Sequence, residues 1–191
     1  MFTSIAIIGR PNVGKSSLFN KLTKSRDAVV SDFPGLTKDR NYGFIKLKNR
    51  DTLLVDTGGI ANKKETIKEA ISQQAWLAVE ESSLIILLLD SSEDLNKEDL
   101  DIIYKLRKLN KDFITVINKI DKKSNSSIYD DLAKNWILEF IKISAEHSKN
   151  LNILKSHLES KVPNVSVELP EGKKVAILGR QNAGKSTFIN Q

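Results

Sequence analysis

A glycine-rich segment near the start of the chain has the residue types and spacing that bind phosphate. It reads G-x-x-x-x-G-K-S with one more serine, and consists of Gly9, Arg10, Pro11, Asn12, Val13, Gly14, Lys15, Ser16 and Ser17. Glycines let the backbone curl so that successive N–H groups point at phosphate oxygens, and a following helix adds the positive end of its dipole. Lys15 supplies a positive charge for the β- and γ-phosphates, and the Ser16 hydroxyl can ligate Mg²⁺. The segment therefore predicts a phosphate cradle of P-loop type.

Two later segments carry groups that can complete a magnesium and γ-phosphate site. One follows an expected strand and consists of Asp56, Thr57, Gly58 and Gly59. Asp56 can hold Mg²⁺ through a bound water, and the N–H of Gly59 can approach the γ-phosphate because no side chain intervenes. The other, 31–40, contains Pro34 and Gly35 and can order when Thr37 completes the Mg²⁺ shell; an ordinary surface loop is the alternative. We expect Lys15, Thr37 and Gly59 to take part in phosphate cleavage.

A third segment is suited to a guanine base. It follows an expected strand, reads N-K-x-D, and consists of Asn118, Lys119, Ile120 and Asp121. A carboxylate accepts two coplanar N–H bonds from guanine, whereas adenine offers neither, so Asp121 would stay unpaired with adenine. The Lys119 stem can lie along the base, Asn118 can tie this loop to the cradle, and Ser144 with Ala145 can present a backbone N–H to the guanine O6. The order of the motifs predicts a guanine-nucleotide site and argues against ATP.

Short apolar runs alternate with amphipathic stretches along the chain. We expect strands at 4–9, 40–47, 52–56, 84–90, 113–118 and 137–143, and helices at 15–22, 64–80, 96–109, 129–136 and 149–160. This alternation predicts an α/β fold: a P-loop NTPase G domain whose mostly parallel sheet has helices on both faces. Trp76 and Trp136 are expected to be packing residues, and His147 and His157 to be solvated.

The pattern starts again near the end of the chain. Pro163, Pro170 and Gly172 mark an expected linker at 163–173, after a first domain at 1–162. Residues 174–191 repeat the first strand, cradle and helix, and the second cradle consists of Gly179, Arg180, Gln181, Asn182, Ala183, Gly184, Lys185 and Ser186. We interpret 174–191 as the truncated start of a second domain. Without magnesium and base motifs of its own, this incomplete P-loop is not expected to bind nucleotide usefully.

The composition of the 191 residues, 40% hydrophobic and 28% charged, is typical of a soluble globular protein. Since there is no cysteine, disulfides and thiolate metal sites are excluded. The longest apolar run, 84–89, is too short to cross a bilayer, and no signal peptide is apparent, so we expect a cytoplasmic protein without membrane association, and a monomer. The net charge of +6 permits contact with RNA, but solvated helix surfaces explain it equally well.

These motifs together resemble the Der (EngA) family, bacterial GTPases with two consecutive G domains. The resemblance is carried by segments 9–16, 34–40, 56–59, 118–121 and 179–186. It implies a GTP-binding and GTP-hydrolysing switch protein that acts in assembly of the large ribosomal subunit and associates with ribosomal RNA, largely through a second G domain and a KH-like domain beyond this segment. A tRNA-modification GTPase is the alternative, because such enzymes share the G-domain motifs.

The resemblance also bears on how water is activated. Ile60 stands where Ras-like proteins have a glutamine that orients the attacking water, and its side chain cannot form a hydrogen bond. Hydrolysis is then either slow, so that the chain is mainly a nucleotide-holding module, or stimulated by another group. In several similar GTPases an asparagine at the position of Asn12 helps to coordinate K⁺ beside the phosphates. This ion can replace an arginine finger. Local bracing of the loop is the alternative role for Asn12.

Overall fold

The computed structural model describes residues 3–23, 41–48, 50–58, 68–123 and 125–162. Several predictions fall outside these residues: the segment 31–40 with Thr37, the site residues Gly59 and Ile60, the linker 163–173, and the second cradle 179–186 within 174–191. The fold and site below are therefore built from the described part of the predicted first domain.

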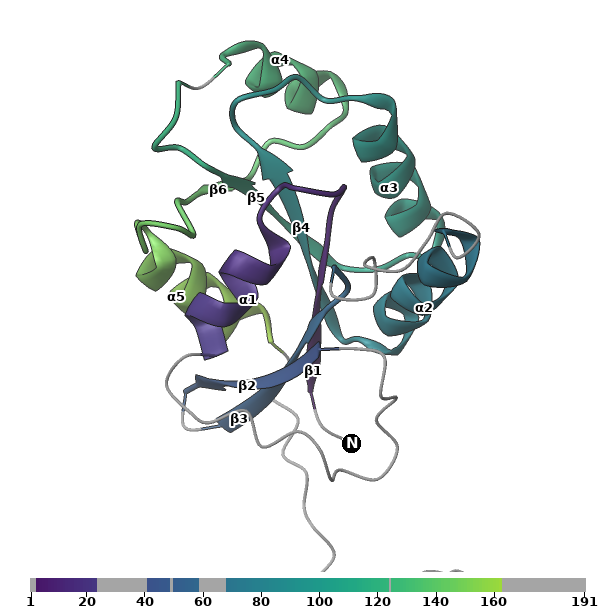
Figure 1. Cartoon of the computed structure of the whole chain (residues 1–191), viewed down its shortest axis with the longest axis vertical. Helices are drawn as coiled ribbons and strands as arrows, with labels where there is room; N and C mark the ends of the chain where they lie inside the picture. The colour runs from purple at the N-terminus through teal and green to yellow at the C-terminus, as the bar shows by residue number, and fades with distance from the viewer. Residues whose placement is uncertain (1–2, 24–40, 49, 59–67, 124, 163–191) are drawn as a thin grey trace, which may run out of the picture.

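A sheet of six strands runs through the centre of the described residues, in the order β2-β3-β1-β4-β5-β6. Its members are β1 (Ser4–Ile8), β2 (Asn41–Leu47), β3 (Arg50–Asp56), β4 (Leu84–Asp90), β5 (Phe113–Asn118) and β6 (Ile141–Lys142). All neighbouring strands are parallel except β2 and β3, which pair antiparallel. The expected mostly parallel sheet is confirmed (Figure 1).

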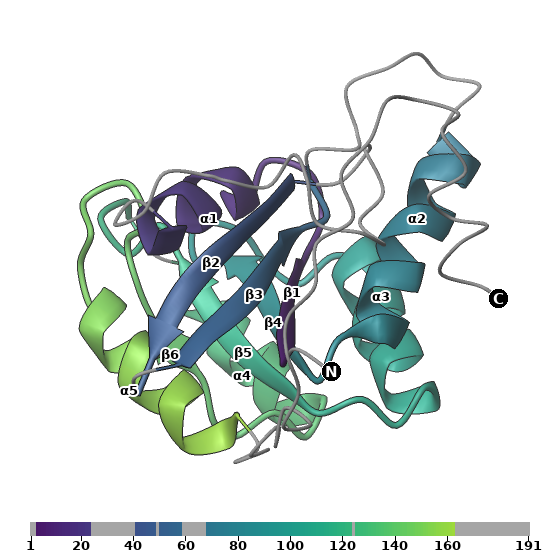
Figure 2. The same ribbon diagram turned by 90° about the horizontal axis from the view of Figure 1, so that it is seen from below.

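Helices cover both faces of this sheet, as Figures 1 and 2 show. They are α1 (Lys15–Thr23), α2 (Lys68–Glu81), α3 (Lys97–Lys108), α4 (Ser127–Lys134) and α5 (Leu151–Lys161). In β1, Ile5 and Ile7 pack in the core cluster that contains apolar residues of α1 and α5, whereas Ala6 and Ile8 pack in the cluster that contains residues of α2, α3 and α4. This alternation follows from the two-residue period of a strand, and it places α1 and α5 opposite the other three helices.

The predicted strand at 137–143 is mostly wrong. Only Ile141 and Lys142 pair with β5, opposite Val116 and Ile117. Leu138 is 75% exposed, because the chain still crosses toward the sheet at that point. An apolar run alone does not show how many of its residues reach a partner strand, and here pairing begins only at the end of the run.

The region around Trp136 also differs from the prediction. The expected helix at 129–136 instead covers Ser127–Lys134. Trp136 follows it with a left-handed φ of 56° and is 84% exposed, so its predicted packing role is wrong. Its backbone N–H still bonds to the Ala133 carbonyl, as in a turn that ends a helix. Trp76, in contrast, lies in α2 and is partly buried against the core, as expected.

No helix among the described residues is both long and apolar enough to cross a membrane.

Candidate nucleotide-binding site

The predicted motifs gather at one edge of the sheet, where the carboxyl ends of the parallel strands lie. Ile7, at the end of β1, is in register with Asp56 at the end of β3. On the other side of β1, Asp90 ends β4 in register with Asn118 at the end of β5. The cradle connects β1 to α1 at this edge (Figure 1). Ligands of open α/β sheets bind at such an edge, so these neighbouring strand ends define the candidate site.

The cradle requires glycine at both of its defining positions. A Cβ added to Gly9 would lie 2.3 Å from the Leu88 carbonyl oxygen. Gly14 has φ +100°, and a Cβ there would lie 2.4 Å from the Asn118 side-chain nitrogen. The turn is therefore both left-handed and packed against the base motif, which no other residue type permits. Val13 between them is fully buried, while Pro11, Asn12 and Ser17 are exposed.

Lys15 is held at the mouth of the cradle. Its Nζ donates to the carbonyl oxygens of Gly9 and Arg10, each at 2.7 Å. Burial lowers the pKa of Lys15 below its ordinary value, and the Arg10 charge adds to this, while Asp56 acts in the opposite sense. A largely desolvated cation whose acceptors in the described part of the chain are carbonyl oxygens is well placed to interact with an anion, because Coulomb attraction is stronger out of bulk water.

The predicted magnesium ligands lie together. The Ser16 hydroxyl donates to Oδ2 of Asp56 at 2.8 Å, and Oδ1 of Asp56 accepts from the Gly58 N–H at 2.8 Å. The Thr57 hydroxyl is directed away, to the Ile7 carbonyl oxygen at 2.7 Å, so it braces β3 against β1. A hydroxyl beside a fully buried carboxylate is a set of hard oxygen donors, and this set fits Mg²⁺.

Asn118 joins three parts of the site. Its amide nitrogen donates to the Val13 carbonyl oxygen at 2.8 Å, and its amide oxygen accepts from the Ala145 N–H at 2.9 Å. The side chain is buried, so both bonds are shielded from water. The cradle, the base motif and the loop after β6 are thus fixed relative to one another, as the sequence predicted for Asn118 and the cradle.

Lys119 forms a second link between the cradle and the base motif. With a left-handed φ of 66°, it directs Nζ to the Asn12 carbonyl oxygen at 2.7 Å and to Oδ2 of Asp90 at 2.6 Å. Burial raises the pKa of Asp90, but hydrogen bonds from Lys119 and Ser92 outweigh burial, and the pKa lies below its ordinary value. Asp90 is therefore a charged anchor for Lys119, and the sequence reasoning missed it. Its place at a strand end beside β5 was the available signal.

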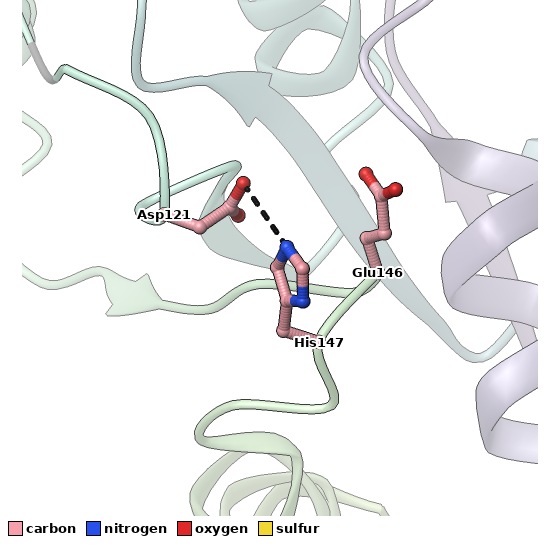
Figure 3. A group of neighbouring side chains, drawn as sticks. All are labelled: Asp121, Glu146 and His147. Atoms are coloured by element: carbon pink, nitrogen blue, oxygen red, sulfur yellow. Dashed lines mark ion pairs between the residues drawn. The ribbon is translucent and has the colours of Figure 1, made fainter.

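Asp121 lies at the rim of the site with His147 and Glu146 (Figure 3). Nε2 of His147 is 3.7 Å from Oδ2 of Asp121. A hydrogen bond from Ser144 lowers the pKa of Asp121, and the nearby His147 and Lys122 charges act in the same direction. The three side chains offer ligand atoms within 4.8 Å of one another, but an ion held there would occupy the carboxylate expected to bind the base. His147 is exposed as predicted; its proximity to Asp121 was not predicted.

The loop after β6, which contains Ser144 and Ala145, is bonded both to itself and to the base motif. The Ser144 N–H donates to the Lys149 carbonyl oxygen at 3.2 Å, and the Ala145 N–H is engaged by Asn118. The Ile120 N–H donates to the Ile143 carbonyl oxygen at 3.2 Å. The loop after β6 therefore supports the base motif, and the contact of Ser144 and Ala145 with the guanine O6 stays a prediction.

Replacing Asn118 with alanine is expected to lower the free energy of unfolding by about 2–4 kcal/mol, because it leaves two buried backbone groups without partners. Urea unfolding of the 191-residue chain measures this. Asn152→Ala, on the exposed side of α5, is the matched control and should change stability by no more than about 0.5 kcal/mol. Equal effects of the two substitutions would contradict the structural role of Asn118.

Comparison with known proteins agrees with this geometry. Residues 4–119 match the family described as 50S ribosome-binding GTPase. The chain is similar to GTPase Der of Cellvibrio japonicus, 40% identical over 195 residues, and to GTPase Der of Stenotrophomonas maltophilia R551-3, 39% identical over 197 residues. Both alignments cover 100% of this chain and 42% of the relative, so the chain spans less than half the length of these relatives.

Two solved structures resemble the fold at 30% identity. A variant of Era from Aquifex aeolicus, bound to GDP and AlF₄⁻, aligns with a TM-score of 0.71 over 93% of this chain and 63% of its own. A GTP-binding protein of Sulfolobus solfataricus in complex with GDP aligns with a TM-score of 0.60 over 83% of this chain and 51% of its own. The P-loop G-domain fold and the resemblance to Der are thereby confirmed, and the chain belongs to the family of 50S ribosome-binding GTPases.

Proposed function

We propose that this chain binds GTP and GDP at the edge formed by the ends of β1, β3 and β5, and hydrolyses GTP to GDP and phosphate as a molecular switch. The observation that carries the proposal is the double link from the base motif to the cradle, through Asn118 to Val13 and through Lys119 to Asn12. A phosphate site and a base site held at a constant separation suit a nucleotide, whereas free phosphate would need only the cradle. The family to which the chain belongs supports hydrolysis.

Different residues of the site have different roles in binding phosphate and Mg²⁺. Lys15 binds the β- and γ-phosphates, and the backbone between Gly9 and Gly14 surrounds them. Ser16 would hold Mg²⁺ directly and Asp56 through water, with Thr37 and Gly59 as the proposed partners once the γ-phosphate is bound. When bound, Mg²⁺ neutralises charge that develops between the β- and γ-phosphates. The residues of this chain thereby orient the γ-phosphate for attack by water.

The base is recognised by a carboxylate that adenine cannot satisfy. Asp121 accepts from the N1 and N2 hydrogens of guanine, and the bond from Ser144 lowers the pKa of this carboxylate. The Lys119 stem lies along the base, held by Asp90. Selectivity for guanine follows because a carboxylate that faces adenine loses its contact with water and gains no bond in return.

We also propose that Asn12 helps to bind K⁺ and that hydrolysis is slow without this ion. Asn12 is exposed at the cradle, and its side-chain amide oxygen accepts no hydrogen bond from any residue in the described ranges, which leaves this oxygen available for a cation. Turnover of GTP with Mg²⁺ is therefore expected to be at least about tenfold faster in KCl than in NaCl at equal ionic strength. Release of phosphate by the 191-residue chain measures this.

Two variants sharpen this test. Asn12→Ala should abolish the difference between the two salts, whereas Asn20→Ala, an exposed position of α1, should retain it. Equal rates of the unaltered protein in both salts would contradict the potassium site. Equal rates at background level would also contradict hydrolysis and favour a nucleotide-holding module.

The biological role that we propose is assembly of the large ribosomal subunit, in the cytoplasm, by a monomer that contacts ribosomal RNA. The family description and the similarity to GTPase Der support this role. We also propose that residues 1–162 form the first G domain and that residues 174–191, which include Lys185 and Ser186, begin the second. Cosedimentation of the chain with purified 50S particles, stronger with a non-hydrolysable GTP analogue than with GDP, is the expected result. Absence of the chain from the particle fraction with either nucleotide would contradict it.

A further inference from the structure

The side chain of Arg10 links the phosphate cradle to the start of α3. Its Nη2 lies 2.7 Å from Oε2 of Glu93, and its Nε lies 3.2 Å from Oδ2 of Asp99. The Arg10 side chain is only 12% exposed, so it points into the protein and away from solvent at the cradle. Neither Glu93 nor Asp99 belongs to a motif from which the nucleotide site was inferred.

Among the described residues, Arg10 is the one cation that forms an ion pair with Asp99. It is buried within the first turn of α3, where Asn96 and Asp99 exchange capping bonds of 3.0 and 3.3 Å. Burial raises the pKa of Asp99 above its ordinary value, against the effect of the Asn96 bond and of the Arg10 charge. Oδ1 of Asp99 and Nε of Arg10 are both buried without a hydrogen-bond partner among the described residues. The buried Asp99 charge is therefore compensated by Arg10, whereas Arg10 is paired with both Asp99 and Glu93.

The backbone of Arg10 takes part in the cradle itself. Its carbonyl oxygen accepts one of the two bonds from Nζ of Lys15, at 2.7 Å. Any shift of Arg10 would therefore move a carbonyl group that positions the phosphate-binding cation. The neighbouring Gly9 is already packed against β4, so Arg10 is the next residue along the loop that needs an anchor.

The negative charges of Glu93 and Asp99 make it possible to distinguish a positioning role from direct electrostatic attraction of phosphate. Glu93 and Asp99 are negative groups near a site for a strongly negative ligand. By long-range electrostatics alone they weaken phosphate binding, so removing either charge would strengthen it. An anchor has the opposite effect, because its loss lets the cradle leave the conformation that fits phosphate.

We propose that Glu93 and Asp99 are positioning residues for phosphate binding, which act through Arg10 to hold the cradle in its binding conformation. This inference rests on the proposed binding of guanine nucleotide. It assigns the connection between β4 and α3 a part in that binding, without contact with the ligand.

The test uses Glu93→Gln in the 191-residue chain, because Glu93 is 56% exposed and its replacement should leave the fold intact. Calorimetry at low salt, where an exposed pair is less screened, measures Kd for GDP and for IDP, which lacks the 2-amino group. We expect GDP binding to weaken roughly threefold, as for other contacting charged pairs. The ratio of the GDP and IDP affinities should stay unchanged, because the base pocket is not altered.

Glu98→Gln is the matched control. Glu98 is an exposed acid in the same first turn of α3, and it makes no ion pair with Arg10. Its replacement should leave GDP affinity unchanged or slightly higher. The double variant Arg10→Gln with Glu93→Gln should bind GDP no more weakly than Arg10→Gln alone, because the effect of Glu93 passes through Arg10.

The outcomes are distinct. Unchanged or tighter GDP binding by Glu93→Gln would overturn the positioning role, and so would equal weakening by Glu93→Gln and Glu98→Gln. Thermal unfolding without nucleotide shows whether each variant is folded, so a loss of affinity by an intact variant is read as positioning. If the unaltered chain binds neither GDP nor IDP, the proposed function itself is wrong, and this inference with it.

Discussion

Replacing Lys15 with alanine is expected to weaken binding of GTP and GDP by about a hundredfold or more. The ammonium group lies at the mouth of the cradle, where its acceptors among the described residues are the carbonyl oxygens of Gly9 and Arg10, and it supplies the charge-assisted bonds to phosphate. Its loss also leaves these two carbonyls without their donor. The loss should be larger for GTP than for GDP, because only GTP presents the γ-phosphate.

Calorimetric titration of the variant in the presence of Mg²⁺ measures this loss. Lys108→Ala is the control, because it removes the same charge from an exposed position at the end of α3. The control should bind within about a factor of two of the unaltered protein, since a solvated charge at that distance is screened. Nucleotide binding by Lys15→Ala at full strength would contradict the placement of phosphate in the cradle.

Replacing Asp121 with asparagine is expected to change the base that the site prefers. An asparagine presents one donor and one acceptor where the carboxylate presents two acceptors, and xanthine has a carbonyl where guanine has the 2-amino group. GDP affinity should fall roughly a hundredfold, and XDP affinity should rise above that for GDP. Titration of both nucleotides against the same preparation gives the ratio directly.

Asp101→Asn, at an exposed position of α3, is the control for this change of charge and should leave the GDP to XDP ratio unaltered. Because Asp121 also lies 3.7 Å from His147, His147→Gln tests whether that contact contributes. A variant Asp121→Asn that still prefers GDP by the original margin would place the base elsewhere. Loss of both nucleotides with an intact fold would contradict the proposed two-bond geometry.

The cradle, the magnesium groups and the base motif were predictable because each is a local pattern at a strand end. Asp56 and Asn118 lie at strand ends that parallel pairing brings to one edge, so the order of the motifs also predicted their proximity. The strand β4 was likewise predicted correctly. Because it is buried on both faces, its residues are apolar almost throughout and do not alternate with polar ones.

The remaining features depend on contacts between residues far apart in the sequence. The pair of Arg10 with Asp99 joins the cradle to α3, and the pair of Lys119 with Asp90 joins the base motif to the end of β4; no local pattern shows that these side chains meet. The exposed Trp136 was misread for a related reason: an aromatic residue in an amphipathic stretch packs only if the helix continues, and here the helix ends before it.

The most direct test of the central claim is competition between guanine and adenine nucleotides for the 191-residue chain. A fluorescent GDP derivative is bound in the presence of Mg²⁺ and then displaced with unlabelled GDP or ADP. The arrangement of Asp121, Asn118 and Lys119 beside the cradle predicts displacement by GDP at concentrations at least about a hundredfold below those needed for ADP. Equal displacement by GDP and ADP would contradict the claim that this edge of the sheet is a guanine-nucleotide site.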